Sequence, residues 1–123
     1  MPECPFCNVE PNRVIEKRKL SIAFFDKFPV SIGHVLIIPR RHEPNYFNLT
    51  LEEKLDIEKL TNSVINYLKM KFSPDGFNIG INIGKAAGQT ILHTHVHIIP
   101  RYDGDVEDPT GGVRGVIPIK QKY

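Results

Sequence analysis

Three histidines occupy alternate positions near the C-terminal end of the sequence: His93, His95 and His97. In an extended segment such positions share one face of a sheet, so the spacing predicts three imidazole rings on one surface. Imidazole has an ordinary pKa near neutrality, which suits it to nucleophilic attack, proton transfer or metal binding. The alternating positions are apolar and are expected on a buried opposite face: Leu92, Val96 and Ile98.

One metal ion is not expected to bind the whole triad. Alternate residues of a strand lie about 6.6 Å apart, which separates the Cα atoms of His93 and His97 by about 13 Å. Zinc–nitrogen bonds are only about 2 Å long. A neighbouring pair such as His93 and His95 remains compatible with a shared ion.

The two cysteines, Cys4 and Cys7, are the other candidate ligands. Their spacing also occurs in redox-active thiol pairs, but those follow a first strand and begin a helix, and only three residues precede Cys4. The pattern therefore favours zinc, which soft thiolates bind well. A closed tetrahedral site needs two more ligands. His42 and one end of the triad would complete it, and spacing alone does not choose among the histidine pairings.

Composition describes an ordinary globular chain. The 123 residues are 41% hydrophobic and 24% charged, with a net charge of +2. This length predicts a single domain over residues 1–123, and the small charge does not predict a nucleic-acid partner. No apolar run reaches the roughly 18 residues of a membrane span, and the N-terminal residues lack a signal-peptide core, so a cytoplasmic location is expected.

The chemistry-bearing residues fall on an alternation of strands and one long helix. Strands are expected at residues 13–19, 20–25, 34–38 and 77–83, and through the histidine segment. Thr50 and Glu53 form a capping-box pattern that begins a helix at about 51–72. Its apolar stripe is expected in the core, with the charges on a solvated face: Leu51, Leu55, Ile57, Leu60, Val64, Leu68 and Phe72. This pattern predicts an α+β domain on an antiparallel sheet.

The histidine segment, with the Ile-Ile that follows it, resembles the signature of the histidine triad (HIT) family. The resemblance extends to Phe24-Phe25-Asp26 with His34 eight residues later, and to Gly88-Gln89-Thr90 before the triad. It covers about residues 4–102 and leaves 103–123 as an irregular tail. Cys4 and Cys7 with His42 are similar to a zinc-bearing branch of the family. That resemblance implies His93 as the fourth ligand of a structural Zn²⁺.

The family resemblance implies a HIT-like fold of about five antiparallel strands with one long helix, and a homodimer. It also implies reaction at the α-phosphate of a nucleotide. In that scheme His95 is the nucleophile that forms a nucleotidyl-imidazole intermediate, and His97 hydrogen-bonds a phosphate oxygen or the leaving group. His34 stands behind the triad and fixes ring orientation.

The same resemblance assigns nucleotide-binding roles. Asp26 either accepts hydrogen bonds from the ribose or is a simple turn residue after a strand. Phe6 and Phe24 either line the base pocket or belong to the core. Three polar residues are candidates for phosphate contacts: Asn82, Gln89 and Thr90. Asn82 could instead cap the loop that follows it, and Arg114 in the tail is either a contact to a distal phosphate or a surface residue.

The sequence thus predicts a nucleotide hydrolase, with diadenosine polyphosphates as the expected substrates. Alternatives within the same mechanism are a nucleoside phosphoramidase and a nucleotidyltransferase or phosphorylase. A nucleotide-binding protein with little turnover, and a hydrolase whose zinc activates water, are alternatives of other classes.

Overall fold

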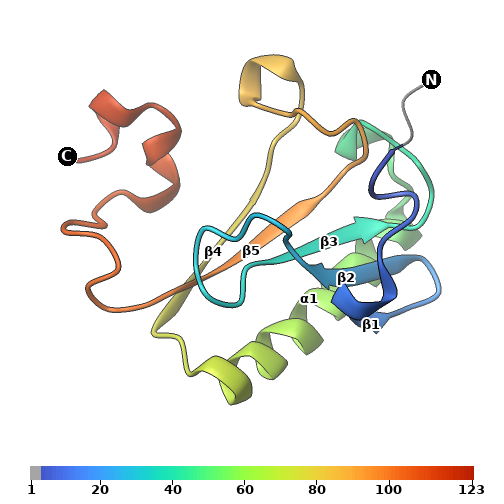
Figure 1. Ribbon diagram of the computed structural model, residues 1–123. Helices are drawn as coiled ribbons and strands as arrows, with labels where there is room; N and C mark the ends of the chain where they lie inside the picture. The colour runs from blue at the N-terminus through green and yellow to red at the C-terminus, as the bar shows by residue number, and fades with distance from the viewer. Residues whose placement is uncertain (1–3) are drawn as a thin grey trace.

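The computed structural model describes residues 4–123 and contains a five-stranded antiparallel sheet in the order β1-β2-β3-β5-β4 (Figure 1). The strands are β1 (Val14–Lys17), β2 (Ser21–Phe25), β3 (Val35–Pro39), β4 (Gly76–Ile81) and β5 (Val96–Arg101). The helical segments are α1 (Leu51–Phe72) and the 3-10 helices η1 (Pro11–Arg13), η2 (Tyr46–Asn48), η3 (Lys85–Ala87), η4 (Gly112–Val116) and η5 (Pro118–Lys120). The expected α+β architecture, with one long helix on an antiparallel sheet, is confirmed.

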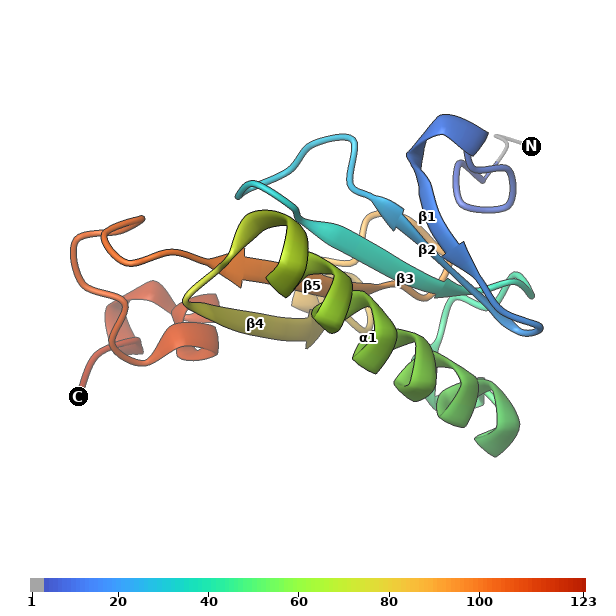
Figure 2. The same ribbon diagram turned by 90° about the horizontal axis from the view of Figure 1, so that it is seen from below.

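Helix α1 begins and ends where local chemistry predicts. Thr50 accepts a hydrogen bond from the backbone N–H of Glu53, and the Glu53 carboxylate accepts one from the Thr50 backbone. The helix ends at Ser73, whose left-handed backbone (φ 50°) cannot continue it. Figure 2 shows α1 lying across one face of the sheet, so this face is covered along most of its length.

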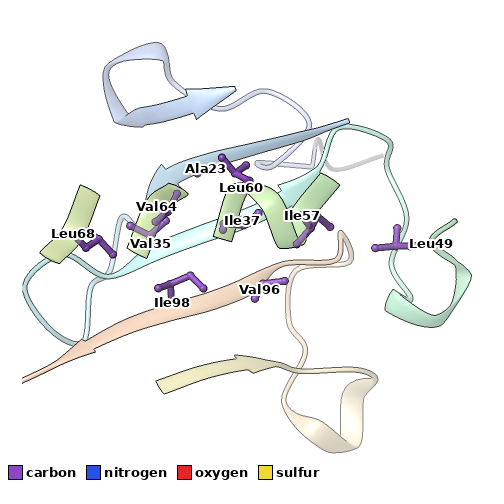
Figure 3. Packing of buried hydrophobic residues seen from close by; sticks show 10 residues of the cluster. All are labelled: Ala23, Val35, Ile37, Leu49, Ile57, Leu60, Val64, Leu68, Val96 and Ile98. Atoms are coloured by element: carbon purple, nitrogen blue, oxygen red, sulfur yellow. The ribbon is translucent and has the colours of Figure 1, made fainter. Parts of the chain in front are cut away.

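Between α1 and the sheet lies the main hydrophobic core (Figure 3). It contains Ala23, Val35, Ile37, Leu49, Ile57, Leu60, Val64, Leu68, Val96 and Ile98. The expected stripe is wrong at its beginning, because Leu51 and Leu55 are 71% and 52% exposed. The first turns of α1 extend past the sheet, and Glu53 is buried there instead because it binds Arg41.

The charges of α1 are not all on a solvated face, which corrects a second expectation. Asp56 reaches the turn between β1 and β2, where its carboxylate accepts hydrogen bonds from Arg18, from the backbone of Leu20 and from the hydroxyl of Ser21. The hydrogen bonds from Ser21 and Arg18 lower the pKa of Asp56 although its burial opposes this. This carboxylate ties the helix to the first hairpin.

The opposite face of the sheet carries the histidine chemistry. Strand register places Phe24, Leu36, His97 and Gly80 in one row across β2, β3, β5 and β4. Phe24 and Leu36 form a small second core together with Ile38. The chain before η1 packs over this core, and the remainder of the row stays available for a ligand.

Only one histidine of the triad lies in a strand. Strand β5 begins at Val96, so His93 and His95 belong to a bent segment before it, and the expectation of three histidines along one strand is wrong. The expected buried position of Leu92 is also wrong, since this side chain is 61% exposed. This segment does not join the sheet because Thr94 is held elsewhere. Its backbone N–H and its hydroxyl both donate to the carbonyl of Glu43, which lies outside the strands.

The tail after residue 102 is more ordered than the expected irregular segment. It contains η4 and η5, and η4 contacts β4. Arg101 pairs with Asp105 through two hydrogen bonds of 2.8 Å, and the hydroxyl of Tyr102 donates to the carbonyl of Ile32. None of the helices in residues 4–123 has the length and apolar character needed to cross a membrane.

Candidate functional site: a histidine pair beside a four-ligand cluster

The proton positions on His95 follow from its backbone partner. Its Nδ1 lies 2.8 Å from the carbonyl oxygen of His93, which accepts only, so Nδ1 carries the proton and Nε2 holds a lone pair. Nε2 makes no hydrogen bond within residues 4–123 and is not among their buried unpaired atoms. The ring therefore presents an unprotonated nitrogen to solvent-accessible space, although His95 as a whole is 7% exposed.

His97 receives the opposite tautomer through His34. The backbone N–H of Val30 donates to Nδ1 of His34 at 3.1 Å, so His34 carries its proton on Nε2. That Nε2 lies 3.0 Å from Nδ1 of His97, which must therefore accept, and the His97 proton stays on its outer Nε2. Two adjacent rings, with centroids 5.1 Å apart, thus present a lone pair and an N–H.

Burial keeps His34 and His97 neutral. Desolvation, followed by the neighbouring rings of His95 and His34, lowers the pKa of His97 to about 4. Desolvation likewise lowers the pKa of His34, and the Asp26 carboxylate, 3.5 Å from its Nε2, partly opposes this. At neutral pH both rings hold a single proton, in the positions that the hydrogen bonds dictate.

The loop between β2 and β3 is closed tightly enough to hold His34 in place. The backbone N–H of Asp26 donates to the carbonyl of His34, and Asp26 Oδ1 accepts from the N–H of Phe28. Gly33 precedes His34 with φ +88°, and a Cβ there would stand 2.9 Å from the ring of Phe72. Only glycine accommodates both the backbone conformation and the close approach.

A second loop, residues 84–90, lies between β4 and the triad and is held by Gln89. Its side-chain oxygen accepts from the N–H of Gly84, and its nitrogen donates to the carbonyls of Pro44 and Ile91. In this structure both ends of the amide are engaged by the backbone, so Gln89 shapes the loop. The hydroxyl of Thr90 is exposed and makes no hydrogen bond within residues 4–123.

Beside His97 the sheet surface is left open. Gly80 is its cross-strand neighbour on β4, and a Cβ at that position would meet nothing within 4 Å. Asn82 follows on the same alternation, half-buried, at the entrance to the 84–90 loop. A ligand can therefore approach His97 closely over the backbone of β4.

The two phenylalanines occupy different environments. Phe24 has no exposed surface and belongs to the second core. Phe6 is half-buried and lies between this core and the triad, with ring centroids 5.4 Å from Phe24 and 5.0 Å from His95. Of the two alternatives raised by the sequence, Phe24 is core, and Phe6 is the one that can contact a ligand.

The remaining member of the triad belongs to a separate cluster. Cys4, Cys7, His42 and His93 place one ligand atom each within 4.8 Å of one another. His93 donates its Nε2 proton to the carbonyl of Pro39 at 2.8 Å, which leaves its Nδ1 unprotonated and facing the cysteines. Such a backbone partner for the outer nitrogen is typical of metal-binding histidines.

Three of the separations in this cluster match those of a tetrahedral zinc ion. Bonds of about 2.05 Å to nitrogen and 2.3 Å to sulfur separate two nitrogens by about 3.4 Å and a nitrogen from a sulfur by about 3.6 Å. The Nδ1 atoms of His42 and His93 lie 3.3 Å apart. His93 Nδ1 is 3.5 Å from Cys4 Sγ and 3.6 Å from Cys7 Sγ. The four residues can therefore hold a metal ion.

A second group of possible ligands, Asp26, His34 and His97, does not fit a metal equally well. Binding an ion through Nε2 would require the neutral His34 ring to move its proton to Nδ1. That nitrogen already faces the donating N–H of Val30. Among residues 4–123, both groups hold their possible ligand atoms within 4.8 Å of one another. The proton positions assign the cysteine-containing group to a metal and the group of Asp26, His34 and His97 to a hydrogen-bonded relay.

Supporting residues near the cluster were not found from the sequence. Arg41, next to His42, forms a two-point ion pair with Glu53 at the start of α1, and this pairing lowers the pKa of Glu53. The carbonyl of Glu43 holds Thr94 between two histidines of the triad. Backbone carbonyls leave no signal in a sequence, although the pairing of Arg41 with a capping-box glutamate is one that charge patterning could suggest.

Comparison with known proteins agrees with this geometry. The HIT domain family model matches residues 8–104. The asymmetrical bis(5'-nucleosyl)-tetraphosphatase of Schizosaccharomyces pombe is 41% identical over 97 residues, covering 79% of this chain and 53% of that protein. The AP-4-A phosphorylase of Mycobacterium tuberculosis is 34% identical over 119 residues, covering 94% of this chain and 60% of that protein.

Among solved structures, the hypothetical histidine triad nucleotide-binding protein of Sulfolobus tokodaii superposes with a TM-score of 0.77 at 36% identity. The match covers 85% of this chain and 73% of that one. A histidine pair on an open sheet face, a long helix behind it and the family match lead to one conclusion. This chain belongs to the HIT domain family.

Proposed function

We propose that this protein hydrolyses nucleotides at the α-phosphate through a covalent nucleotidyl-His95 intermediate. The observation that carries the proposal is the hydrogen bond from His95 Nδ1 to the carbonyl of His93, because it leaves Nε2 unprotonated without the help of a base. His97, one ring away, has its proton on the outer nitrogen. The two rings supply a nucleophile and a hydrogen-bond donor in the form each needs.

The reaction proceeds in two balanced steps. The His95 lone pair forms a bond to the α-phosphorus, the bond from that phosphorus to the leaving-group oxygen breaks, and the oxygen keeps the electron pair and departs as an anion that accepts a hydrogen bond from the His97 N–H. In the second step water attacks the same phosphorus and releases a proton to solvent, while the nitrogen–phosphorus bond breaks and returns its electron pair to His95. Nucleoside monophosphate leaves, and both rings regain their starting forms.

The groups around the pair would position the nucleotide. Asp26 would accept from the ribose hydroxyls through Oδ2, since Oδ1 already caps the loop. The Thr90 hydroxyl, the Asn82 amide and the backbone N–H groups of the 84–90 loop would donate to the phosphate oxygens. Phe6 would contact the base. Gln89 would act indirectly, by holding the loop in the shape that these donors require.

Diadenosine polyphosphates are the proposed substrates. Two relatives of this chain carry the names bis(5'-nucleosyl)-tetraphosphatase and AP-4-A phosphorylase. Both contain much more chain than the matched part, so the full activity of neither transfers directly. The second name also makes phosphorolysis a specific alternative, in which phosphate in place of water attacks the intermediate.

For the metal cluster we propose a structural Zn²⁺ bound by Cys4, Cys7, His42 and His93. Four protein ligands close a tetrahedral site and leave no position for a metal-bound water, which disfavours the zinc-activated hydrolase. When bound, the ion would join the N-terminal segment to the start of the triad and so fix the His93 carbonyl that orients His95.

We also propose a homodimer, as the family resemblance implies. β4 is an edge strand of the sheet, and Ile79 on it is 46% exposed. An uncovered edge offers free backbone N–H and C=O groups to a second copy. Size-exclusion chromatography with light scattering tests the assembly, and a monomer at micromolar concentration would contradict it.

The decisive experiment incubates the protein with diadenosine tetraphosphate and follows AMP by chromatography. His95→Ala is expected to lower turnover by orders of magnitude while nucleotide binding, measured by calorimetry, persists. Rapid quenching with mass detection should show an adenylyl adduct on His95 of the wild type only. If added phosphate changes the product from AMP to ADP, the reaction is phosphorolysis. If neither the wild type nor His95→Ala shows turnover but both bind the nucleotide, the protein is a nucleotide-binding protein and not an enzyme of this kind.

A further inference from the structure

A cavity lies on the same sheet face as His97. Side chains alternate along β5, so His97, Ile99 and Arg101 point to one side of the sheet. Ile99 and Arg101 line a hollow of about 520 Å³, and Asn78, the cross-strand neighbour of Ile99, lines it as well. Residues two positions apart on a strand are separated by about 7 Å. Ile99, the first residue of β5 in the cavity lining, is therefore about that distance from His97.

Two segments distant in the sequence form the walls. One is the loop between β2 and β3, through Val30 and Ile32, and the other is the tail, through Val106 and Pro109. The Tyr102 hydroxyl, which donates to the carbonyl of Ile32, joins the two walls. The tail folds back beside the end of β5 (Figure 1). The cavity is therefore built from hydrogen-bonded parts.

The lining is apolar with a few polar groups. The hydroxyl of Ser31 is buried and makes no hydrogen bond to residues 4–123, although the residue lines the cavity. Such a group costs stability unless a ligand or water satisfies it. The Asn78 oxygen accepts from Arg101, while no bond within the described chain engages its NH₂ group. Free hydrogen-bonding groups over apolar walls suit a heteroaromatic ligand.

Charge argues against a phosphate in this cavity. Among the described residues that line it, Arg101 is the only cationic side chain, and Asp105 neutralises it through two hydrogen bonds of 2.8 Å. The same ion pair raises the pKa of Arg101. The cavity volume lies within the roughly 300–1,000 Å³ of small-molecule sites. An uncharged nucleoside fits these properties better than an anion does.

The direction in which the leaving group departs connects the cavity to the proposed reaction at the α-phosphate. In the proposed reaction the leaving oxygen stands opposite His95 and accepts a hydrogen bond from His97. The ring of His97 lies next to that of His95, with centroids 5.1 Å apart, and the cavity lining on β5 begins with Ile99, two residues beyond His97 on the same face. We propose that this cavity binds the nucleoside of the departing half of a dinucleoside polyphosphate. The inference rests on the proposed function and adds to it a binding site for the leaving nucleoside.

The test compares a dinucleotide with a mononucleotide. Val106→Trp fills the cavity from the tail, and Val116→Trp, 78% exposed on the same tail and outside the lining, is the matched control. Val106→Trp is expected to raise KM for diadenosine tetraphosphate at least about tenfold and to change the inhibition constant of AMP less than about twofold. The Val116 variant should match the wild type in both.

Ser31→Ala gives an independent readout. If the hydroxyl serves a ligand, its loss raises KM for the dinucleotide about threefold or more without lowering the melting temperature, because no internal hydrogen bond is lost. A merely structural hydroxyl would leave KM unchanged.

The outcomes separate the two proposals. Equal effects of Val106→Trp on diadenosine tetraphosphate and AMP, or no effect on either, overturn the cavity assignment. A wild-type protein that releases no AMP or ADP refutes the proposed function instead. Calorimetric binding of diadenosine tetraphosphate to the same three variants then tests the cavity by itself, with the same expected order of affinities.

Discussion

Replacing His97 by glutamine should flatten the pH dependence of stability. The folded environment lowers the pKa of His97 to about 4, whereas the unfolded chain has the ordinary value of 6.5. At pH values between about 4 and 6.5, this ring is protonated in the unfolded chain but not in the folded protein. Stability from this ring is therefore complete above about pH 6.5 and is lost as the pH falls toward 4. Glutamine has no such proton to bind, so His97→Gln removes this loss.

The magnitude follows from the two pKa values. Between about pH 7.5 and pH 5, linkage predicts that His97 alone reduces the free energy of unfolding by about 2 kcal/mol. The result is insensitive to the folded pKa, because a value near 5 would still give more than about 1.5 kcal/mol. The difference between wild type and His97→Gln should therefore change by about 2 kcal/mol between the two pH values.

Urea unfolding followed by circular dichroism measures this difference. Both proteins are studied with and without added Zn²⁺, because protonation of metal ligands affects them equally and cancels in the comparison. Proton NMR of the imidazoles provides a second readout in the wild type, where one ring should stay neutral down to about pH 5. Identical pH profiles for the two proteins, with all rings titrating near their ordinary pKa, would refute the reasoning.

Three further outcomes are expected. Cys7→Ser should lose stoichiometric zinc by elemental analysis and unfold at a lower temperature, and a chelator should reproduce this in the wild type, since binding energy at a structural site is folding energy. Gln89→Ala removes three hydrogen bonds from the 84–90 loop and should cost about 2 kcal/mol in urea unfolding together with most of kcat; unchanged kcat would contradict its proposed role. Gly33→Ala combines a positive φ with a Cβ 2.9 Å from Phe72 and should cost more than about 2 kcal/mol, whereas Gly104→Ala, with φ +81° but open space, should cost only about 1 kcal/mol by the same measurement.

Short-range patterns in the sequence predicted most of the fold. The capping box placed the start of α1 at residue 51, and the alternation of apolar side chains located the strands to within a few residues. These signals depend on neighbouring residues, so the sequence carries them completely. The predicted burial of Leu51 and Leu55 was wrong, because an apolar stripe does not indicate where the sheet beneath a helix ends.

The candidate ligands and catalytic groups were also predictable, because few residue types can perform their chemistry. The two cysteines, the five histidines and Asp26 include every member of the metal cluster and the relay. Spacing could not pair them, since His42 and His93 are 51 positions apart and meet only after folding.

Tertiary structure alone decided what each ring can do. The carbonyl of His93, the carbonyl of Pro39 and the N–H of Val30 assign the protons of three histidines. Every residue except proline has the same backbone N–H and carbonyl groups, so nothing in a sequence marks which of them will face an imidazole. The residue types thus determined that histidine chemistry was available, and the folded backbone determined which nitrogen is left with a lone pair.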